Sequence, residues 1–119
     1  MSNTLFVTVP LIYGAIVGNH GLVVRWTYTV PAGKRAECRY LYGGLTEPTA
    51  IAATTAAVVI RLNAANILTL YSLNRVDYKG QMYGNTFDLV GGDNIDGLTV
   101  NGAAVNAFFE AVAILRLYS

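Results

Sequence analysis

The chain has 119 residues, of which 54% are hydrophobic and 13% are charged, and its formal net charge is +1. The length suits one domain with a substantial core, and the charged fraction is about half of the usual ~25%. A chain with so few charges either spans a membrane or buries much of its surface against copies of itself or a partner. The basic residues form no run, so we expect no nucleic-acid binding, which needs a concentrated positive patch.

The apolar run Leu5–Val17 near the start does not predict a membrane span. It contains a threonine, a proline and a glycine, and it is shorter than the ~20 residues that a spanning helix needs. No basic stretch precedes it, so we do not expect a signal peptide. The composition therefore favours a subunit with large oligomeric interfaces, which are depleted of charge, and no membrane partner.

The first segment, residues 1–21, is predicted to be an N-terminal arm or edge strands ahead of a β-sandwich over 22–119. Leu5–Val9 is a candidate strand that Pro10 ends or marks as an edge, and Leu11–Val17 is a second candidate. Because the segment is apolar, it is predicted to contact a partner, with an ordinary edge strand as the equal alternative. The candidate interface residues on it are Leu5, Phe6, Val7, Leu11 and Tyr13.

The stretch Leu22–Tyr42 has the most regular pattern in the chain, because apolar and polar residues alternate on both sides of a Pro-Ala-Gly turn. This pattern predicts a β-hairpin with one buried face and a three-residue loop. The register that follows pairs Val24 with Tyr40, Trp26 with Cys38 and Tyr28 with Ala36. Cys38, the one cysteine, is expected in the core.

On the other face of this predicted hairpin, Arg25 would lie opposite Arg39. Like charges that face each other across a strand pair are unfavourable. We therefore expect an acidic group from a neighbouring strand, a sister subunit or a partner beside them. Arg25 and Arg39 are for this reason candidate interface residues.

After Tyr42, the sequence predicts short strands separated by turns. Gly43 and Gly44 are expected to break the strand, and 45–55 to form a loop. Further strands are predicted over Ala56–Leu62 and Asn66–Leu73, which form a second hairpin, and over Gly84–Val90 and Ile95–Val100. The most polar stretch, Asn74–Tyr83, is expected to be a surface loop, with Tyr78 and Tyr83 as candidate contacts for a ligand or partner.

The last segment, Ala103–Tyr118, fits two patterns. Phe108, Val112 and Leu115 match a helical stripe, whereas alternate residues from position 105 to 117 make one wholly apolar face at period two. The preceding Asn-Gly dipeptide is a strong hairpin turn and favours a long β-strand. With about eight or nine strands and no βαβ alternation, the chain is predicted to be all-β, a sandwich or barrel.

Few residues suggest chemistry. His20, the one histidine, lies in a Gly-Asn-His-Gly turn and lacks the partners of a triad or zinc site, so we expect it to be solvated. Asp88, Asp93, Asn94 and Asp96 offer oxygen atoms suited to Ca²⁺, but no full ligand set is visible. We favour a glycine turn capped by Asp93, and we expect no enzyme activity, no metal and no cofactor.

Two short motifs resemble those of small jelly-roll proteins in the virions of tailed bacteriophages. They are YTVPAGKRAE over Tyr28–Glu37 and FDLVGGDNID over Phe87–Asp96, and a final alternating strand follows them. In the second motif, Gly-Gly-Asp replaces the usual Ala-Gly-Asp and leaves the turn intact. The resemblance implies a jelly-roll-like antiparallel β-sandwich of about eight strands.

Such proteins include trimeric capsid decoration (cement) proteins and the trimeric heads of phage fibres. The resemblance therefore implies a non-enzymatic structural protein on the capsid surface, which forms a homotrimer, binds the major capsid protein and bridges capsomers. The apolar segment 1–17 is then the candidate capsid-facing arm. The alternative is a receptor- or carbohydrate-binding head domain of a phage fibre or tail, with Tyr78 and Tyr83 as contacts.

Overall fold

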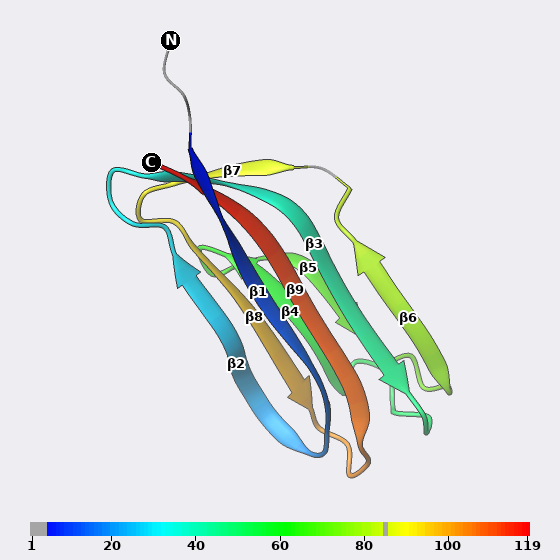
Figure 1. Cartoon of the computed structure of the whole chain (residues 1–119). Coiled ribbons are helices and arrows are strands. Elements are labelled where there is room, and N and C mark those ends of the chain that lie inside the picture. Colours follow the sequence, from blue (N-terminus) through cyan, green and yellow to red (C-terminus); the bar gives the residue numbers. More distant parts are fainter. Residues whose placement is uncertain (1–4, 85) are drawn as a thin grey trace.

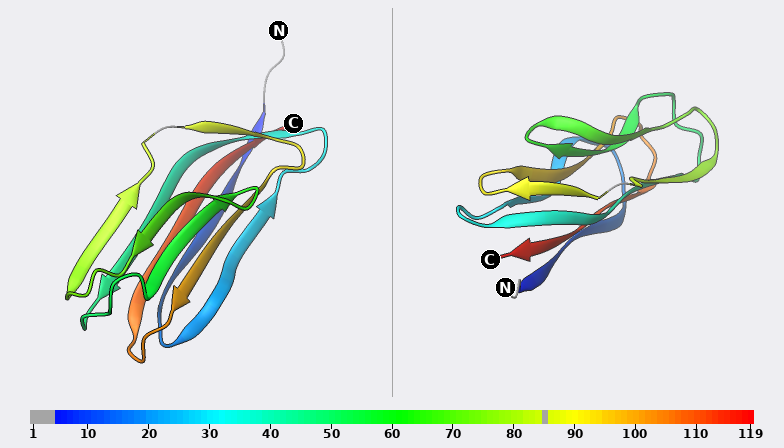
Figure 2. Two further views of the ribbon diagram at one scale, coloured as in Figure 1. Left: turned by 180° about the vertical axis from the view of Figure 1, so that it is seen from behind. Right: turned by 90° about the horizontal axis from the view of Figure 1, so that it is seen from above.

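The computed structural model describes residues 5–84 and 86–119, which form strands and connecting turns without a helix. In chain order the strands are β1 (Phe6–Val17), β2 (His20–Thr29), β3 (Arg35–Glu47), β4 (Ala56–Leu62), β5 (Ala65–Tyr71), β6 (Asp77–Met82), β7 (Phe87–Val90), β8 (Asn94–Asn101) and β9 (Ala107–Tyr118). They build two antiparallel sheets that form two packed layers in the right-hand view of Figure 2. The predicted all-β sandwich is confirmed. Within the described ranges there is no helix long and apolar enough to cross a membrane.

The strand order is that of a jelly roll. Sheet A has the order β1-β9-β3-β6, with β7 also paired to β3, and sheet B has the order β2-β8-β4-β5 (Figure 1). β6 and β7 pair with different halves of β3, so together they act as one interrupted strand. Most consecutive strands lie in opposite sheets, whereas β4 and β5 form the predicted hairpin. The expectation of a jelly-roll-like sandwich of about eight strands is confirmed.

The predicted hairpin over Leu22–Tyr42 is wrong. β2 pairs with β8 in sheet B, and β3 pairs with β9 in sheet A. The local turn forms as expected, because Gly33 has a φ of 79° and the Lys34 N–H donates to the Pro31 carbonyl over 3.1 Å. A tight turn reverses the chain, but in a sandwich the reversed chain can enter the facing sheet. The two apolar faces then meet across the core instead of side by side.

Bulges in β2 and β3 decide which side chains face the core. Arg25 is the extra residue between the Val24–Leu98 and Trp26–Gly97 pairs, and Arg39 is the extra residue of β3. An extra residue reverses the alternation of faces. Trp26 and Cys38 therefore pack inward as predicted, whereas the predicted burial of Leu22, Val24 and Tyr40 is wrong, since these side chains face outward.

β3 continues through Gly43 and Gly44, where a break was expected. A Cβ on Gly43 would lie 2.5 Å from Leu68 Cδ2 of sheet B, so the missing side chain makes room for sheet packing. The stretch Asn74–Tyr83, predicted to be a loop, contains β6. Its Lys79 Nζ donates to Oε2 of the fully buried Glu47 over 2.9 Å, which secures the pairing of β6 with β3.

β9 is the long strand that the period-two pattern of the C-terminal segment predicts. It has a central position in sheet A. It pairs with β1 on one side and with β3 on the other. Its inward residues are small or apolar and fully buried: Ala107, Phe109, Ala111, Ala113 and Leu115. The Asn101-Gly102 turn leads from β8 in sheet B to β9 in sheet A, so the predicted hairpin at this turn is wrong.

Trp26 links the two sheets. Its indole lies over Gly97 of β8, and its Nε1–H donates to the Ala111 carbonyl of β9 over 2.9 Å. A Cβ on Gly97 would lie 2.5 Å from Trp26 Cε2. The contact therefore requires glycine at position 97.

We expect Gly97→Ala to lower the free energy of unfolding by about 1–3 kcal/mol, because the added methyl group displaces the indole. Gly21→Ala is the matched control, since no atom lies within 4 Å of a Cβ at that strand position. The control should change stability by less than ~0.5 kcal/mol. Urea denaturation measures both, and equal effects of the two substitutions would contradict the role of Gly97.

Candidate interaction surface

The outward side of sheet A is apolar over much of its area. We call it face A, which consists of alternate residues from Phe6 to Ile16 in β1 and from Phe108 to Tyr118 in β9, with the outward residues of β3 and β6. The register aligns its side chains in rows across the strands. One row is Ile12, Val112, Tyr42 and Met82, and another is Ile16, Phe108, Thr46 and Tyr78. Ile12 and Ile16 are 65% and 69% exposed, so face A presents large apolar side chains to its surroundings.

Between these two rows lies a row of three glycines and one acid: Gly14, Glu110, Gly44 and Gly80. The Glu110 carboxylate leans over Gly44, where a Cβ would lie 2.8 Å from its Oε1. The Tyr42 ring lies across Gly80, where a Cβ would be 2.7 Å from Cζ. Burial raises the pKa of Tyr42, and the negative charge of Glu110 adds to the increase. None of the ion pairs in the described part of the chain involves Glu110.

Positive charges lie toward one end of face A. The Arg116 guanidinium lies 4.6 Å from the centroid of the Phe6 ring, and Arg35 lies 4.3 Å from that of Tyr118. Such cation–π contacts hold a cation at the surface without neutralising it. Glu37 lies beside Arg116 at this end, but it is paired with Arg39 at 3.0 Å. Face A thus has an acidic residue at its centre and more positive than negative charge at one end.

The outward side of sheet B, which we call face B, is also apolar at its centre. Its rows are Val24, Leu98, Val59 and Thr69, and then Val100, Ala57 and Tyr71, of which Val24 and Tyr71 are exposed whereas Leu98 and Ala57 are buried. Arg61 and Asp96 are the charged pair on this face, and they form two hydrogen bonds of 3.0 Å each. Asp96 raises the pKa of Arg61 through this hydrogen bonding. Because the two charges satisfy each other, face B offers little net charge to a partner.

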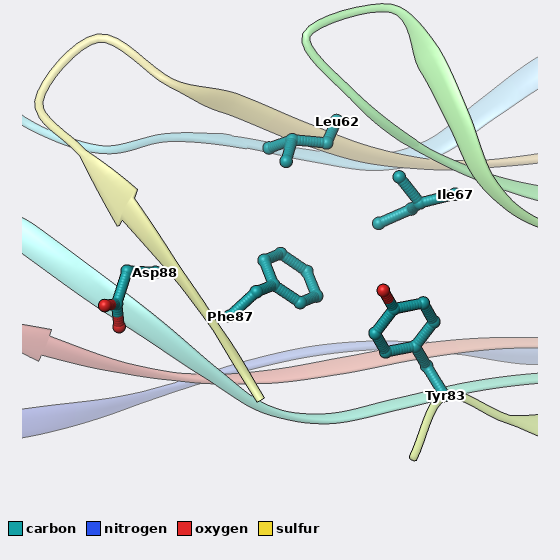
Figure 3. Close-up of a pocket in the computed structure, with 5 residues that line it drawn as sticks. All are labelled: Leu62, Ile67, Tyr83, Phe87 and Asp88. Atoms are coloured by element: carbon teal, nitrogen blue, oxygen red, sulfur yellow. The ribbon is translucent and has the colours of Figure 1, made fainter. Parts of the chain in front are cut away.

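A small cavity of about 210 Å³ opens between the two sheets near the break between β6 and β7. In Figure 3, the rings of Phe87 and Tyr83 point toward Leu62 and Ile67 of sheet B, with Asp88 at one side. Phe87 and Tyr83 meet edge to face, with ring centroids 5.7 Å apart. Ligand sites usually exceed ~300 Å³, so this cavity is small for a ligand site.

The structure separates the candidate residues of the N-terminal segment. Leu5, Phe6 and Val7 are exposed, whereas Leu11 and Tyr13 face inward and pack against the core. An interface role could therefore use the first three directly. Leu11 and Tyr13 could support it only by positioning β1.

Arg25 and Arg39 do not face each other, because their strands lie in different sheets. The Arg25 Nε–H donates to Thr99 Oγ1 over 2.9 Å, and its guanidinium lies over the Tyr13 ring. Arg39 forms an ion pair of 3.0 Å with Glu37 of its own strand. The expectation of two opposed arginines that need an outside acid is therefore wrong.

The two candidate tyrosines lie in different surroundings. Tyr78 is 79% exposed on β6, at the border of face A, to which it belongs, whereas Tyr83 lines the cavity. Tyr40 and Tyr42 of β3 stack at a centroid distance of 6.4 Å on face A. The sequence pattern missed these two as surface aromatics, because the bulge at Arg39 is not visible in it.

His20 is held in place and is not simply solvated, as the sequence had suggested. Its Nδ1–H donates to the Gly18 carbonyl over 2.8 Å, so Nε2 accepts from the Thr99 hydroxyl at 2.9 Å. The ring also meets Phe109 edge-on at 5.7 Å. His20 of sheet B thus contacts Phe109 of sheet A at one end of the sandwich.

Asp93 caps the turn before β8, as predicted. Its carboxylate accepts the Val90 N–H at 2.9 Å and the Asn63 side-chain amide at 3.0 Å. These hydrogen bonds, with the backbone one first, lower the pKa of Asp93. Of the two glycines in the turn, Gly92 has the positive φ, at 93°. Among residues 5–84 and 86–119, no group of three or more His, Cys, Asp or Glu side chains could hold a metal ion.

No protein-family model matches the sequence, and no match was found among curated proteins. Face A and face B, with their charges, are therefore the basis for a functional proposal.

Cys38 should be nearly inert in the folded protein. Burial raises the pKa of its thiol to about 11, against an ordinary value of 9.0, although a backbone hydrogen bond at Tyr40 acts the other way. At pH 8 we expect a thiol reagent to react at least ~100-fold more slowly with the folded protein than with the protein in concentrated urea, because the thiolate is the reacting form. Absorbance of the released thiol-reagent anion follows both rates, and similar rates would contradict the burial.

Proposed function

We propose that this protein is a non-enzymatic structural subunit of a virus particle, a capsid decoration protein that trimerises and bridges neighbouring capsomers of a phage head. The observation that supports the proposal is that face A and face B lie on opposite sides of one sandwich and both carry exposed apolar side chains, Ile12 and Ile16 on face A and Val24 on face B. A subunit with two such faces can hold a sister subunit on one side and a shell subunit on the other. Its place would be the capsid surface, against the major capsid protein.

The distribution of charge supports this proposal. Lys34, Arg35 and the Glu37–Arg39 pair lie near one end of the sandwich, and the ion pair between Arg75 and Asp77 lies near the other. The centres of interfaces are depleted of charge, whereas their rims are polar. Glu110 on face A and the Arg61–Asp96 pair on face B lie within the faces, but the charges at the two ends suit a subunit whose faces become covered.

The mechanism is multivalent attachment. In a trimer, three copies of each contact surface are fixed in one assembly, so the second and third contacts form at a high effective concentration. Weak individual contacts then suffice for firm attachment to a shell. Clamping adjacent shell subunits in this way would resist their separation.

A second candidate function is a receptor- or carbohydrate-binding head domain of a phage fibre. It is favoured by the exposed Tyr78, which lies beside the stacked Tyr40 and Tyr42 and the Glu110 carboxylate. Aromatic rings can stack on sugar rings, and a carboxylate can accept hydrogen bonds from sugar hydroxyls.

The capsid proposal predicts saturable binding to phage shells that lack this protein. Ile12→Lys on face A and Val24→Lys on face B should each weaken binding by at least about tenfold, because a charge is then buried without a partner. Val76→Lys is the control, since Val76 is also exposed but lies in the connection between β5 and β6. Cosedimentation with the shells measures the binding, and an absence of saturable binding by the unmodified protein would refute the proposal.

The fibre-head proposal predicts specific signals on a glycan array that Tyr78→Ala abolishes. Tyr71→Ala serves as the control, because Tyr71 is exposed on face B, on the opposite side of the molecule. Equal loss with both substitutions, or no signal from the unmodified protein, would argue against sugar binding at Tyr78.

A further inference from the structure

We infer that face A pairs with face A of a second copy of this chain about a two-fold axis. The axis runs perpendicular to the strands, between face A of one copy and face A of the other, at the level of Ala113 in β9. β9 of one copy then faces β9 of the other in the antiparallel direction. A residue that precedes Ala113 in one copy therefore faces the residue of the other copy that follows Ala113 by the same number of positions. This pairing goes beyond the proposed function and leaves face B and the sandwich ends for a threefold or shell contact.

The charges on β9 carry this inference. Glu110 and Arg116 both point outward, three residues before and three after Ala113. The two-fold axis brings Glu110 of each copy opposite Arg116 of the other, so two ion pairs form at once. Neither residue belongs to an ion pair within residues 5–84 and 86–119. If a partner covered Glu110 without supplying a cation, the carboxylate would be a buried and unpaired charge, which is strongly unfavourable.

The heights of the two facing rows, that of Glu110 in one copy and that of Arg116 in the other, are also complementary. Glu110 is flanked in its row by Gly14 and Gly44, which have no side chains. Arg116 is flanked by Thr8 and Glu37, which do. The higher arginine row of one copy can therefore enter the lower glycine row of the other, and an arginine can bind a carboxylate with two parallel hydrogen bonds.

The remaining rows place mainly apolar groups against each other, although the outermost rows also bring Thr46 opposite Arg35. The row of Ile12, Val112 and Tyr42 faces the row of Pro10, Ile114 and Tyr40 of the second copy. The row of Ile16 and Phe108 faces that of Phe6 and Tyr118. Isologous contacts require this kind of self-complementarity, in which residue i meets j and j meets i.

The available area is sufficient for a specific dimer. β1, β9 and β3 are 12, 12 and 13 residues long and lie side by side in Figure 1. Strands spaced ~4.8 Å apart that rise ~3.3 Å per residue then present roughly 600 Å². Two copies together reach the lower end of the range for specific interfaces, about 1,200 Å². Facing sheets usually cross at ~30°. For a group that lies ~10 Å from the axis, this crossing displaces the group by only a few ångströms relative to its counterpart, and the long side chains of Glu110 and Arg116 can span that displacement.

The test uses two charge-reversed variants, Glu110→Arg and Arg116→Glu, alone and mixed. In a homodimer of either variant like charges face each other twice, so each alone should dimerise at least about tenfold more weakly than the unmodified protein. In a one-to-one mixture every facing pair is again opposite in charge, so the mixture should regain dimerisation within about threefold of the original. Sedimentation velocity over a micromolar to submillimolar range measures the dissociation constants, and Lys34→Glu, outside face A, should leave them unchanged.

Several outcomes would overturn the inference. The unmodified protein could remain monomeric throughout, form a trimer that both reversals leave intact, or yield a mixture no tighter than the separate variants. Loss of shell binding without any effect on self-association would assign face A to a shell subunit instead. If a reversed variant fails to fold by circular dichroism, Glu110→Gln and Arg116→Gln replace the pair. Each should weaken the dimer by about threefold or more, and mixing should recover part of the loss, because the mixed dimer keeps one Glu110–Arg116 pair.

Discussion

The contact of Trp26 with Gly97 and Ala111 joins the two sheets, and the rest of the architecture is built around it. The indole needs a glycine beside it in β8 and donates to the Ala111 carbonyl of β9, and the bulge at Arg25 in β2 turns it inward toward both. The same bulge sends Val24 outward to face B. One local irregularity thus fixes the depth of the core and supplies an apolar residue to the outer surface.

The strands of this protein could largely be read from its sequence, but their partners could not. The alternation of β9 and the hairpin of β4 and β5 were predictable, because period-two patterns and short turns are local signals. Trp26 and Cys38 were rightly expected inside. The partner of β2 was not predictable, because a Pro-Ala-Gly turn is compatible with pairing in one sheet and with crossing to the other. The bulges at Arg25 and Arg39 leave no mark in the pattern, so the positions of Val24 and Tyr40 were misjudged.

The candidate surface was even less accessible from the sequence. Gly14, Gly44, Gly80 and Glu110 are far apart along the chain, and only the register of four strands places them in one row. The low charge content predicts interfaces with copies of the chain or with a partner, but it does not say where on the molecule they would lie. The structure locates the apolar area on two opposite faces and leaves Glu110 at the centre of one of them. A carboxylate in that place is a strong constraint on whatever covers it.

The edges of the two sheets have a separate consequence. β1 carries Pro10, which has no N–H to offer, and β2 is bulged at Arg25. β5 is bulged at Ile67, and the fourth edge is interrupted between β6 and β7. Continuous edge strands act as templates for endless strand addition, and such interruptions prevent it. Every border of the two sheets therefore carries a feature that disfavours the addition of a further strand, even though the chain is rich in exposed apolar side chains.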